Sequence, residues 1–127
     1  MEIKKGLLYS EDHEWVKVEE DCAYIGISDF AQDALGSIVF VELPDCDAEI
    51  DAGDTFGVVE SVKAASDMYL PVGGTVIETN VSLEDNPENL NEDCYNNWII
   101  KIKMADVSEL DNLMTPESYE KFCQQEA

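Results

Sequence analysis

Short runs of β-branched and aromatic residues recur along most of this chain, and almost every run ends at a turn signal. The runs cover residues 22–28, 37–44, 48–50, 55–62, 67–70, 75–79 and 98–104. The turns between them include the sequences DAGD (51–54) and PVGG (71–74), and the polar stretch 82–97 is predicted as a loop. Short strands at such close spacing are typical of a small β-sandwich or flattened barrel. We therefore predict a mainly β fold of short antiparallel strands.

Two regions carry helix signals instead. Residues 29–36 follow an N-cap residue, Ser28, and end at Gly36, which suits a helix C-terminus. Near the end of the chain, Ser108 is expected to cap a turn, and Thr115 followed by Pro116 predicts the start of a terminal helix. The apolar side chains that this region is expected to pack on the sheet are Leu110, Leu113, Met114, Tyr119, Phe122 and Cys123.

The length of 127 residues fits one domain, residues 1–127, with a core at about 7–104 and a helical extension at 105–127. No apolar run approaches the roughly 18 residues of a membrane span. The N-terminal sequence lacks the apolar core of a signal peptide and the Arg-rich character of a transit peptide. We expect a cytoplasmic protein, or a matrix protein whose presequence has been removed.

The net charge of the chain limits the kinds of molecule that it can bind. The formal net charge is -22, from 29 carboxylates against seven basic residues, all of them lysine. Nucleic acids and anionic membranes need a cationic face, so we expect neither as a partner. Basic protein surfaces suit the chain, and electrostatic steering should make such encounters fast and sensitive to salt. We expect the protein itself to be a monomer.

The cysteines and the acidic turns do not predict a metal site. The four cysteines, Cys22, Cys46, Cys94 and Cys123, are scattered without a C-x-x-C pair, so we expect free thiols. The segment 45–56 alternates carboxylates as a calcium loop does. However, Ile50 and Phe56 occupy the positions where an EF-hand loop needs glycine and a bidentate glutamate. We interpret it as a solvated acidic turn.

Lys63 is the only basic residue in the stretch 18–100. It stands between two strand-like runs, where a tight turn would project its side chain into solvent. A lysine that acts as a base or forms a Schiff base needs burial or cationic neighbours, which lower its pKa. Glu60 and Asp67 are acidic neighbours and act in the opposite direction. The residues alone leave two interpretations open: an amine that another enzyme acylates, or an ordinary solvated lysine.

The segment ESVKAASDMYLPVGG (60–74) resembles the attachment motif of the H-protein family of the glycine cleavage system. The resemblance extends to HEWV (13–16) and to IGISDFAQDALGSIVFVELP (25–44), and it covers most of residues 7–104. Further positions that carry it are Asn80, Pro87, Asn91, Tyr95 and Trp98. Lipoyl domains of 2-oxoacid dehydrogenases and biotin carriers fit less well, since those have Asp before the modified lysine or methionines on both sides of it.

The resemblance implies a hammerhead fold of the lipoyl and biotinyl type and a carrier without catalytic residues of its own. It implies that Lys63 carries lipoate through an amide bond. The carrier would pass the aminomethyl group of glycine from a pyridoxal-phosphate glycine decarboxylase (P-protein) to a tetrahydrofolate-dependent aminomethyltransferase (T-protein). A dihydrolipoyl dehydrogenase (L-protein) would reoxidise it, and a lipoate ligase or lipoyltransferase would load it.

The resemblance also singles out residues around the arm. By composition alone, a lone histidine such as His13 in an acidic segment is usually solvated. In the family this segment borders a cleft that shelters the arm, so the resemblance makes His13 and Glu14 candidates for sheltering or recognising the arm. Glu14 is the main candidate to hold a cationic amine there, and Asp67 is a weaker one. Glu60 and Gly74 are expected to help set the shape that the modifying enzyme recognises.

The chain departs from the family pattern in several loops. A usual glycine is missing at 46–48, Cys94 stands in place of a common proline, Asn97 in place of a glycine, and Gly73 in place of a serine. Asparagine tolerates the left-handed backbone, so we expect the change at Asn97 to be mild. Two alternatives remain open: an H-like protein used in lipoate relay or another lipoyl-dependent system, and an acidic interaction module that is never modified.

Overall fold

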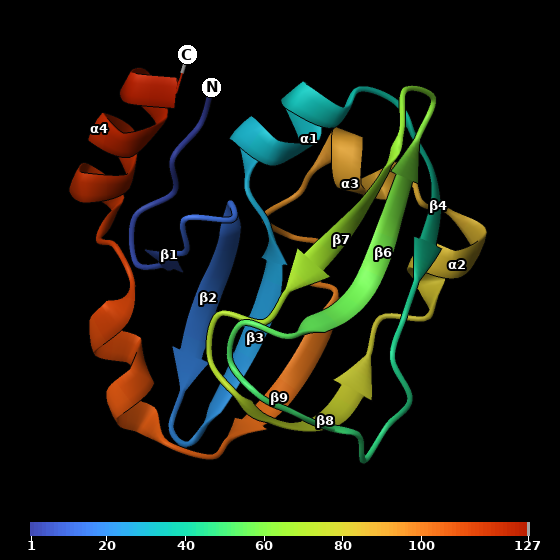
Figure 1. Cartoon of the computed structure of the whole chain (residues 1–127). Helices are drawn as coiled ribbons and strands as arrows, with labels where there is room; N and C mark the ends of the chain where they lie inside the picture. Colours follow the sequence, from blue (N-terminus) through green and yellow to red (C-terminus); the bar gives the residue numbers. More distant parts are fainter. Residues whose placement is uncertain (127) are drawn as a thin grey trace.

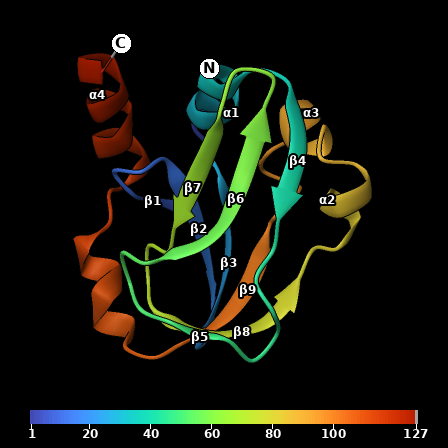
Figure 2. The ribbon, with the colours of Figure 1, turned by 45° about the vertical axis from the view of Figure 1, so that its right-hand side comes forward.

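Two antiparallel β-sheets form the body of the molecule in a computed structural model, which describes residues 1–126. The larger sheet has six strands in the order β1-β2-β3-β9-β8-β5, and the smaller has three in the order β4-β6-β7. Figure 2 shows the smaller sheet lying in front of the larger one. The strands are β1 (Leu8–Tyr9), β2 (Glu14–Glu19), β3 (Cys22–Ile27), β4 (Ile38–Glu42), β5 (Glu49–Ile50), β6 (Thr55–Ser61), β7 (Ala65–Tyr69), β8 (Gly74–Thr79) and β9 (Ile100–Met104). The predicted fold class, mainly β with short antiparallel strands, is confirmed.

The helices surround the two sheets: Figure 1 shows α1 and α3 at one end, α2 beside β4, and α4 along the side that β1 and β2 form. They are α1 (Asp29–Leu35), α2 (Ser82–Asp85), α3 (Asn89–Glu92), the 3-10 helix η1 (Val107–Asn112) and α4 (Pro116–Glu126). Helix α1 has the predicted caps: the Ser28 hydroxyl accepts from the Ala31 amide, and Gly36 adopts a φ of 78°. Among residues 1–126, no helix is both long enough and apolar enough to cross a membrane.

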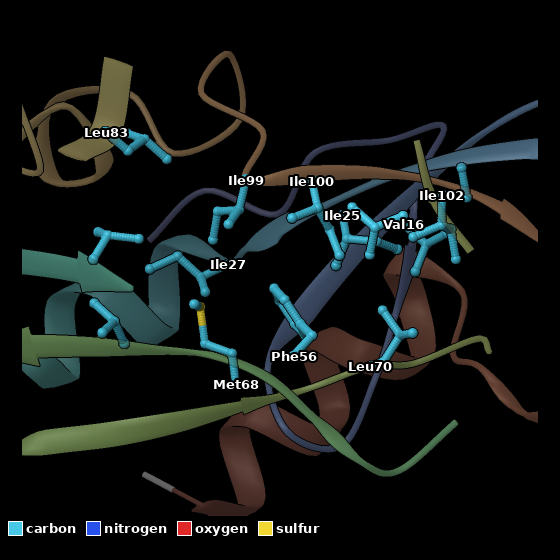
Figure 3. Packing of buried hydrophobic residues seen from close by; sticks show 14 of the residues in the cluster. Val16, Ile25, Ile27, Phe56, Met68, Leu70, Leu83, Ile99, Ile100 and Ile102 are labelled. Atoms are coloured by element: carbon cyan, nitrogen blue, oxygen red, sulfur yellow. The ribbon is translucent and has the colours of Figure 1, made fainter. Parts of the chain in front are cut away.

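The main core fills the space between the two sheets. Figure 3 shows side chains of the larger sheet, among them Val16, Ile25 and Ile102, opposite Phe56 and Met68 of the smaller sheet. In β7 the buried Met68 has exposed neighbours, as the two-residue period of a strand allows, whereas β2 buries its first three residues in a row and exposes its last three. Removing this apolar surface from water is the main force that holds the two sheets together.

The polar stretch 82–97 is not the loop that we predicted. It contains α2 and α3, each of which buries one leucine, Leu83 or Leu90. Their main-chain polar groups need partners close to the core, and a single helical turn supplies these locally. The sequence analysis also missed β1 and β2, which form one edge of the larger sheet.

The terminal helix α4 starts as predicted, with the Thr115 hydroxyl accepting from the Ser118 amide. The cap of η1 was assigned wrongly: the Asp106 carboxylate accepts from the amide and hydroxyl of Ser108, because aspartate precedes the turn and reaches its free amide. Leu110, Leu113 and Met114 are only partly buried there. Helix α4 packs on the β1 edge rather than on a sheet face, through a second apolar cluster in which the rings of Tyr9 and Tyr119 stack at 4.3 Å.

The lysine hairpin and the buried carboxylate

Lys63 lies in the turn that joins β6 to β7, and its side chain is exposed, as predicted. The side chain of Ser61 holds this turn together. Its hydroxyl oxygen accepts from the main-chain amides of Lys63 and Ala64, at 3.1 and 3.3 Å, and its amide donates to the Ala64 carbonyl at 2.9 Å. The Val62 amide donates to the Ser37 carbonyl at 3.0 Å, which ties the turn to the segment before β4. The main chain at Lys63 is therefore fixed, although its side chain is in solvent.

The lysine side chain passes beside the end of helix α1. A Cβ atom at Gly36 would lie 3.4 Å from Lys63 Cε, and the ammonium makes a long, weak contact with the Ala34 carbonyl at 3.5 Å. Within residues 1–126, Lys63 forms no ion pair. Among the described residues, the amine is thus accessible and makes one weak contact.

The two acidic candidates on the hairpin point to its outer face. Glu60 is paired with Ala65, next to the turn, and Asp67 is paired with Val58, further down the hairpin. Both are exposed, whereas Met68, between Asp67 and the end of β7, points into the core. Glu60 is therefore exposed directly beside the turn that carries Lys63.

Glu14 is a buried carboxylate at the start of β2, with a side chain that is 2% exposed. One carboxylate oxygen accepts from the Ser10 hydroxyl at 2.7 Å, and the other accepts from the amide of Tyr69, at the end of β7, at 3.3 Å. Glu14 thus links the two sheets. Because a strand rises about 3.3 Å per residue, the four steps from Ala65 to Tyr69 place Glu14 about 13 Å from the hairpin turn.

Burial changes the acidity of this group. Removal from water raises the pKa of Glu14 from 4.5 to about 8, while the hydrogen bond from Ser10 acts in the opposite direction and the charge of Asp12 adds to the increase. Near neutral pH the side chain is therefore largely protonated. A cation placed beside it would lower the pKa again and would draw the proton off.

His13 belongs to a different part of the molecule. Its ring contacts the Tyr119 hydroxyl and the Glu126 carboxylate, each at 2.8 Å, and it stacks on the Phe30 ring at 4.4 Å. Composition alone favoured a solvated histidine, but the side chain is 15% exposed because three aromatic and polar groups of α1 and α4 cover it. His13 therefore connects helix α4 to the start of β2. Its role as a candidate beside the arm stays a prediction.

Gly74 also lies away from Lys63. It opens β8, where it pairs with Ile50 and Met104. A Cβ atom there would come within 2.2 Å of the Lys103 carbonyl oxygen, so the strand pairing itself requires glycine. The structure does not bring Gly74 to the hairpin, and its influence on recognition stays a prediction.

In two of the loops that depart from the family pattern, the residue present is accommodated by its own backbone conformation or hydrogen bonds. Asp47 takes the left-handed conformation at a φ of 72°, where a glycine would be unstrained. Asn97 does not have a positive φ. Its amide group instead donates to the carbonyls of Asn89 and Asp93, which closes the turn after α3.

The described residues contain no cluster of three or more histidine, cysteine or acidic side chains that could hold a metal ion. All four cysteines are free thiols, and burial raises the pKa of Cys94 to about 12. The sequence analysis did not identify Ser61 and Ser10, which hold the Lys63 turn and the Glu14 carboxylate, because no charge or spacing signals their short-range hydrogen bonds.

Comparison with known proteins places the whole chain in one group. A scan of protein families matches residues 7–126 to the family described as "Glycine cleavage H-protein". The protein named "Glycine cleavage system H protein" from Alkaliphilus oremlandii is 61% identical over 127 residues and is covered completely, as is this chain. One of the same name from Clostridium botulinum is 58% identical over 98% of this chain and 96% of its own. The crystal structure of a glycine cleavage system H protein from Mycobacterium marinum matches with a TM-score of 0.85 at 30% identity, over 97% of this chain and 98% of that one.

Proposed function

The chain belongs to the glycine cleavage H-protein family, and on that premise we propose that Lys63 is its lipoyl-lysine. The observation that carries the proposal is the exposed amine of Lys63 on a turn that Ser61 holds in one conformation. Acylation converts the ammonium into a neutral amide and disturbs the weak contact of the ammonium with the Ala34 carbonyl. The residues present therefore fit the cofactor.

As an H protein, the chain is a non-catalytic carrier component of the glycine cleavage system. When bound, lipoate supplies a dithiolane that takes up and releases the aminomethyl group of glycine. The part that this chain contributes is position: a tethered group reaches successive active sites at a high effective concentration. We assign as its partners the P-protein, the T-protein, the L-protein and the enzyme that attaches lipoate.

Glu14 is the residue that we assign to sheltering the loaded arm. Its carboxyl group is buried and lies at the end of β7, the strand that leads from the Lys63 turn. An exposed ion pair contributes about 0–1 kcal/mol to stability. The attraction between the two charges is stronger in a desolvated pair, because water does not screen it. The cationic amine of the loaded arm would lower the pKa of Glu14 and so generate the carboxylate that holds it.

Substituting Glu14 tests this role. Glu14→Gln keeps a similar shape and cannot ionise, so lipoylation should proceed normally. Once loaded and diluted away from the partner enzymes, the variant should lose its one-carbon unit spontaneously about five- to thirty-fold faster, a difference of about 1–2 kcal/mol. Asp67→Asn, which lies on the outer face, is the matched control and should decay at the wild-type rate. Equal decay of Glu14→Gln and wild type would remove Glu14 from this role.

The carrier role is tested by exchange of bicarbonate with the carboxyl group of glycine in the presence of the P-protein. Lys63→Arg keeps the positive charge but offers a guanidinium that a lipoate ligase does not acylate. We expect this variant to remain folded and to support no exchange. Exchange at the wild-type level would overturn the assignment of Lys63.

One alternative is favoured less by the comparisons. The relatives at 61% and 58% identity both carry the name of the glycine cleavage H protein over nearly their full lengths. An H-like protein used in another lipoyl-dependent system would support lipoylation but no glycine exchange, so the same assay separates the two.

A further inference from the structure

Apolar side chains gather beside Lys63 on the outer face of the smaller sheet. Val39, Phe40 and Val62 are 54%, 47% and 69% exposed. Phe40 is paired with Glu60, which is paired with Ala65 across the hairpin, and Val62 adjoins the lysine directly. Single exposed apolar residues are ordinary, whereas several together next to a modified position mark a contact surface.

A β-bulge creates this exposure. Ile38 pairs with Ser61 and Phe40 pairs with Glu60, so Val39 is an extra residue in β4. Ile38 is buried, while both residues after it face solvent, which the regular alternation of a strand would not allow. Bulges often re-aim side chains beside functional sites. Strand β4 is also an edge of the smaller sheet. Exposed apolar residues on an edge strand promote association with another protein, so we infer that a partner binds there.

Acidic side chains surround the apolar ones. We call the whole surface the hairpin face, and it consists of Val39, Phe40, Glu42, Val58, Glu60, Val62 and Asp67. Its charged members are all carboxylates, and Lys63 lies at the end of the face that the β6–β7 turn forms. A complementary surface therefore has an apolar pocket with basic residues around it.

We propose that the hairpin face is the docking surface for the enzyme that acylates Lys63, with Phe40 as its apolar anchor. This inference rests on the proposed function. The acylating enzyme has to bring its active site to the lysine nitrogen itself, so its surface must cover the side chains next to the turn. Enzymes that use the finished arm can instead meet it at its far end, away from the hairpin.

The chemistry explains why the contact must be this close. The bond from Lys63 Nζ to the carbonyl carbon of an acyl adenylate forms as the bond from that carbon to the phosphate oxygen breaks. AMP leaves, and the lysine nitrogen gives up two protons to solvent. The activated acyl group comes from lipoate and ATP, so the carrier contributes only the amine and the surface that positions it.

The test uses the full chain, a purified lipoate ligase, lipoate and ATP, with lipoylation followed by intact mass at varied carrier concentration. Phe40→Ser and Val62→Ser are the test variants. Ile77→Ser is the matched control, because Ile77 is also an exposed apolar residue at a β-bulge, but lies in β8 of the other sheet. Thermal unfolding midpoints check that each variant is folded. If Phe40→Ser is unstable, the result for Val62→Ser, a substitution in the turn, decides the test.

We expect each test variant to lower kcat/KM for the carrier about ten-fold, as the loss of one well-packed interface residue does. Ile77→Ser should remain within about two-fold of the wild type. If the wild type is lipoylated normally and both test variants match it, the docking proposal is overturned while the proposed function stands. It is overturned equally if lipoylation is unchanged and only glycine exchange falls, since the face would then serve the P-protein. A wild-type chain that gains no lipoyl group would overturn the proposed function as well.

Discussion

Lys63 owes its position to a neighbouring serine and not to any partner of its own side chain. The Ser61 hydroxyl fixes the main chain of the turn, and the amine beside Gly36 makes a weak contact with the Ala34 carbonyl. Glu14 is the opposite case, since both of its carboxylate oxygens are occupied and its side chain is withdrawn from water. Lys63 is therefore accessible to solvent, whereas Glu14 is shielded from it.

Glu14 should make the stability of the protein depend on pH in a defined window. Its pKa is 4.5 when unperturbed and about 8 in the folded protein. Between these values the unfolded chain has released the proton and the folded protein still holds it. The stability linked to Glu14 is therefore fully present below about pH 4.5 and is lost as the pH rises towards 8.

The Glu14→Gln variant lacks this titration while every other group stays the same. From about pH 5.5 to 7.5, the free energy of unfolding of the wild type should fall relative to that of the variant, by up to about 1.4 kcal/mol per pH unit. Urea unfolding of both proteins across this range measures the difference. Curves that stay parallel would mean that Glu14 does not keep its proton in the folded state.

Helix α4 is tied to the rest of the chain by contacts that span most of the sequence. The Tyr119 hydroxyl lies 2.8 Å from His13 Nδ1 and 2.7 Å from Ser28 Oγ, and the second nitrogen of His13 contacts Glu126 near the end of the helix. These contacts join α4 to the start of β2 and to the N-cap of α1.

Removing the Tyr119 hydroxyl should weaken this connection. Tyr119→Phe leaves the ring stack with Tyr9 in place but deprives two polar groups of a partner, and a loss of about 1–3 kcal/mol in the free energy of unfolding is expected. Tyr69→Phe is the control, since Tyr69 is exposed, and it should change stability by less than about 0.5 kcal/mol. Chemical denaturation measures both, and equal stabilities would show that the hydroxyl network contributes nothing.

The elements differ in how far the sequence could predict them. Strands β3, β6 and β8 follow β-branched runs and were predicted to within about a residue or two. Strand β2 was missed because its buried Glu14 breaks the alternation of apolar and charged residues. Helices α2 and α3 were missed because each is one turn long and its single leucine is surrounded by polar residues.

The same limit applies to the site. The exposed turn position of Lys63 was predictable because the strand-like runs on either side of it are local features. The assignment of Lys63 as the modified residue stays a prediction. The partners of His13 were not predictable, since Tyr119 lies 106 residues further along the chain. Contacts of that range depend on how the helices close over the sheets, which no pattern in the sequence specifies.

At the scale of the whole molecule, charge is the dominant property. The formal net charge of -22 should steer the carrier towards basic surfaces of its partner enzymes. We expect kcat/KM for lipoylation to fall about ten-fold or more as the salt concentration rises from about 0.02 to 0.5 M, because the Debye length shortens from tens of ångströms to a few. Matched titrations with two different neutral salts separate screening from specific ion effects. A rate that does not change with ionic strength would show that steering plays no part.

The central claim is that this fold presents Lys63 for lipoylation. The most direct measurement is the intact mass of three proteins after incubation with lipoate, ATP and a lipoate ligase: the wild type, Lys63→Arg, and Lys101→Arg as a control that removes a lysine of β9. We expect the wild type and Lys101→Arg to gain the mass of one lipoyl group each and Lys63→Arg to gain none. A lipoyl group on Lys63→Arg, or none on the wild type, would contradict the claim.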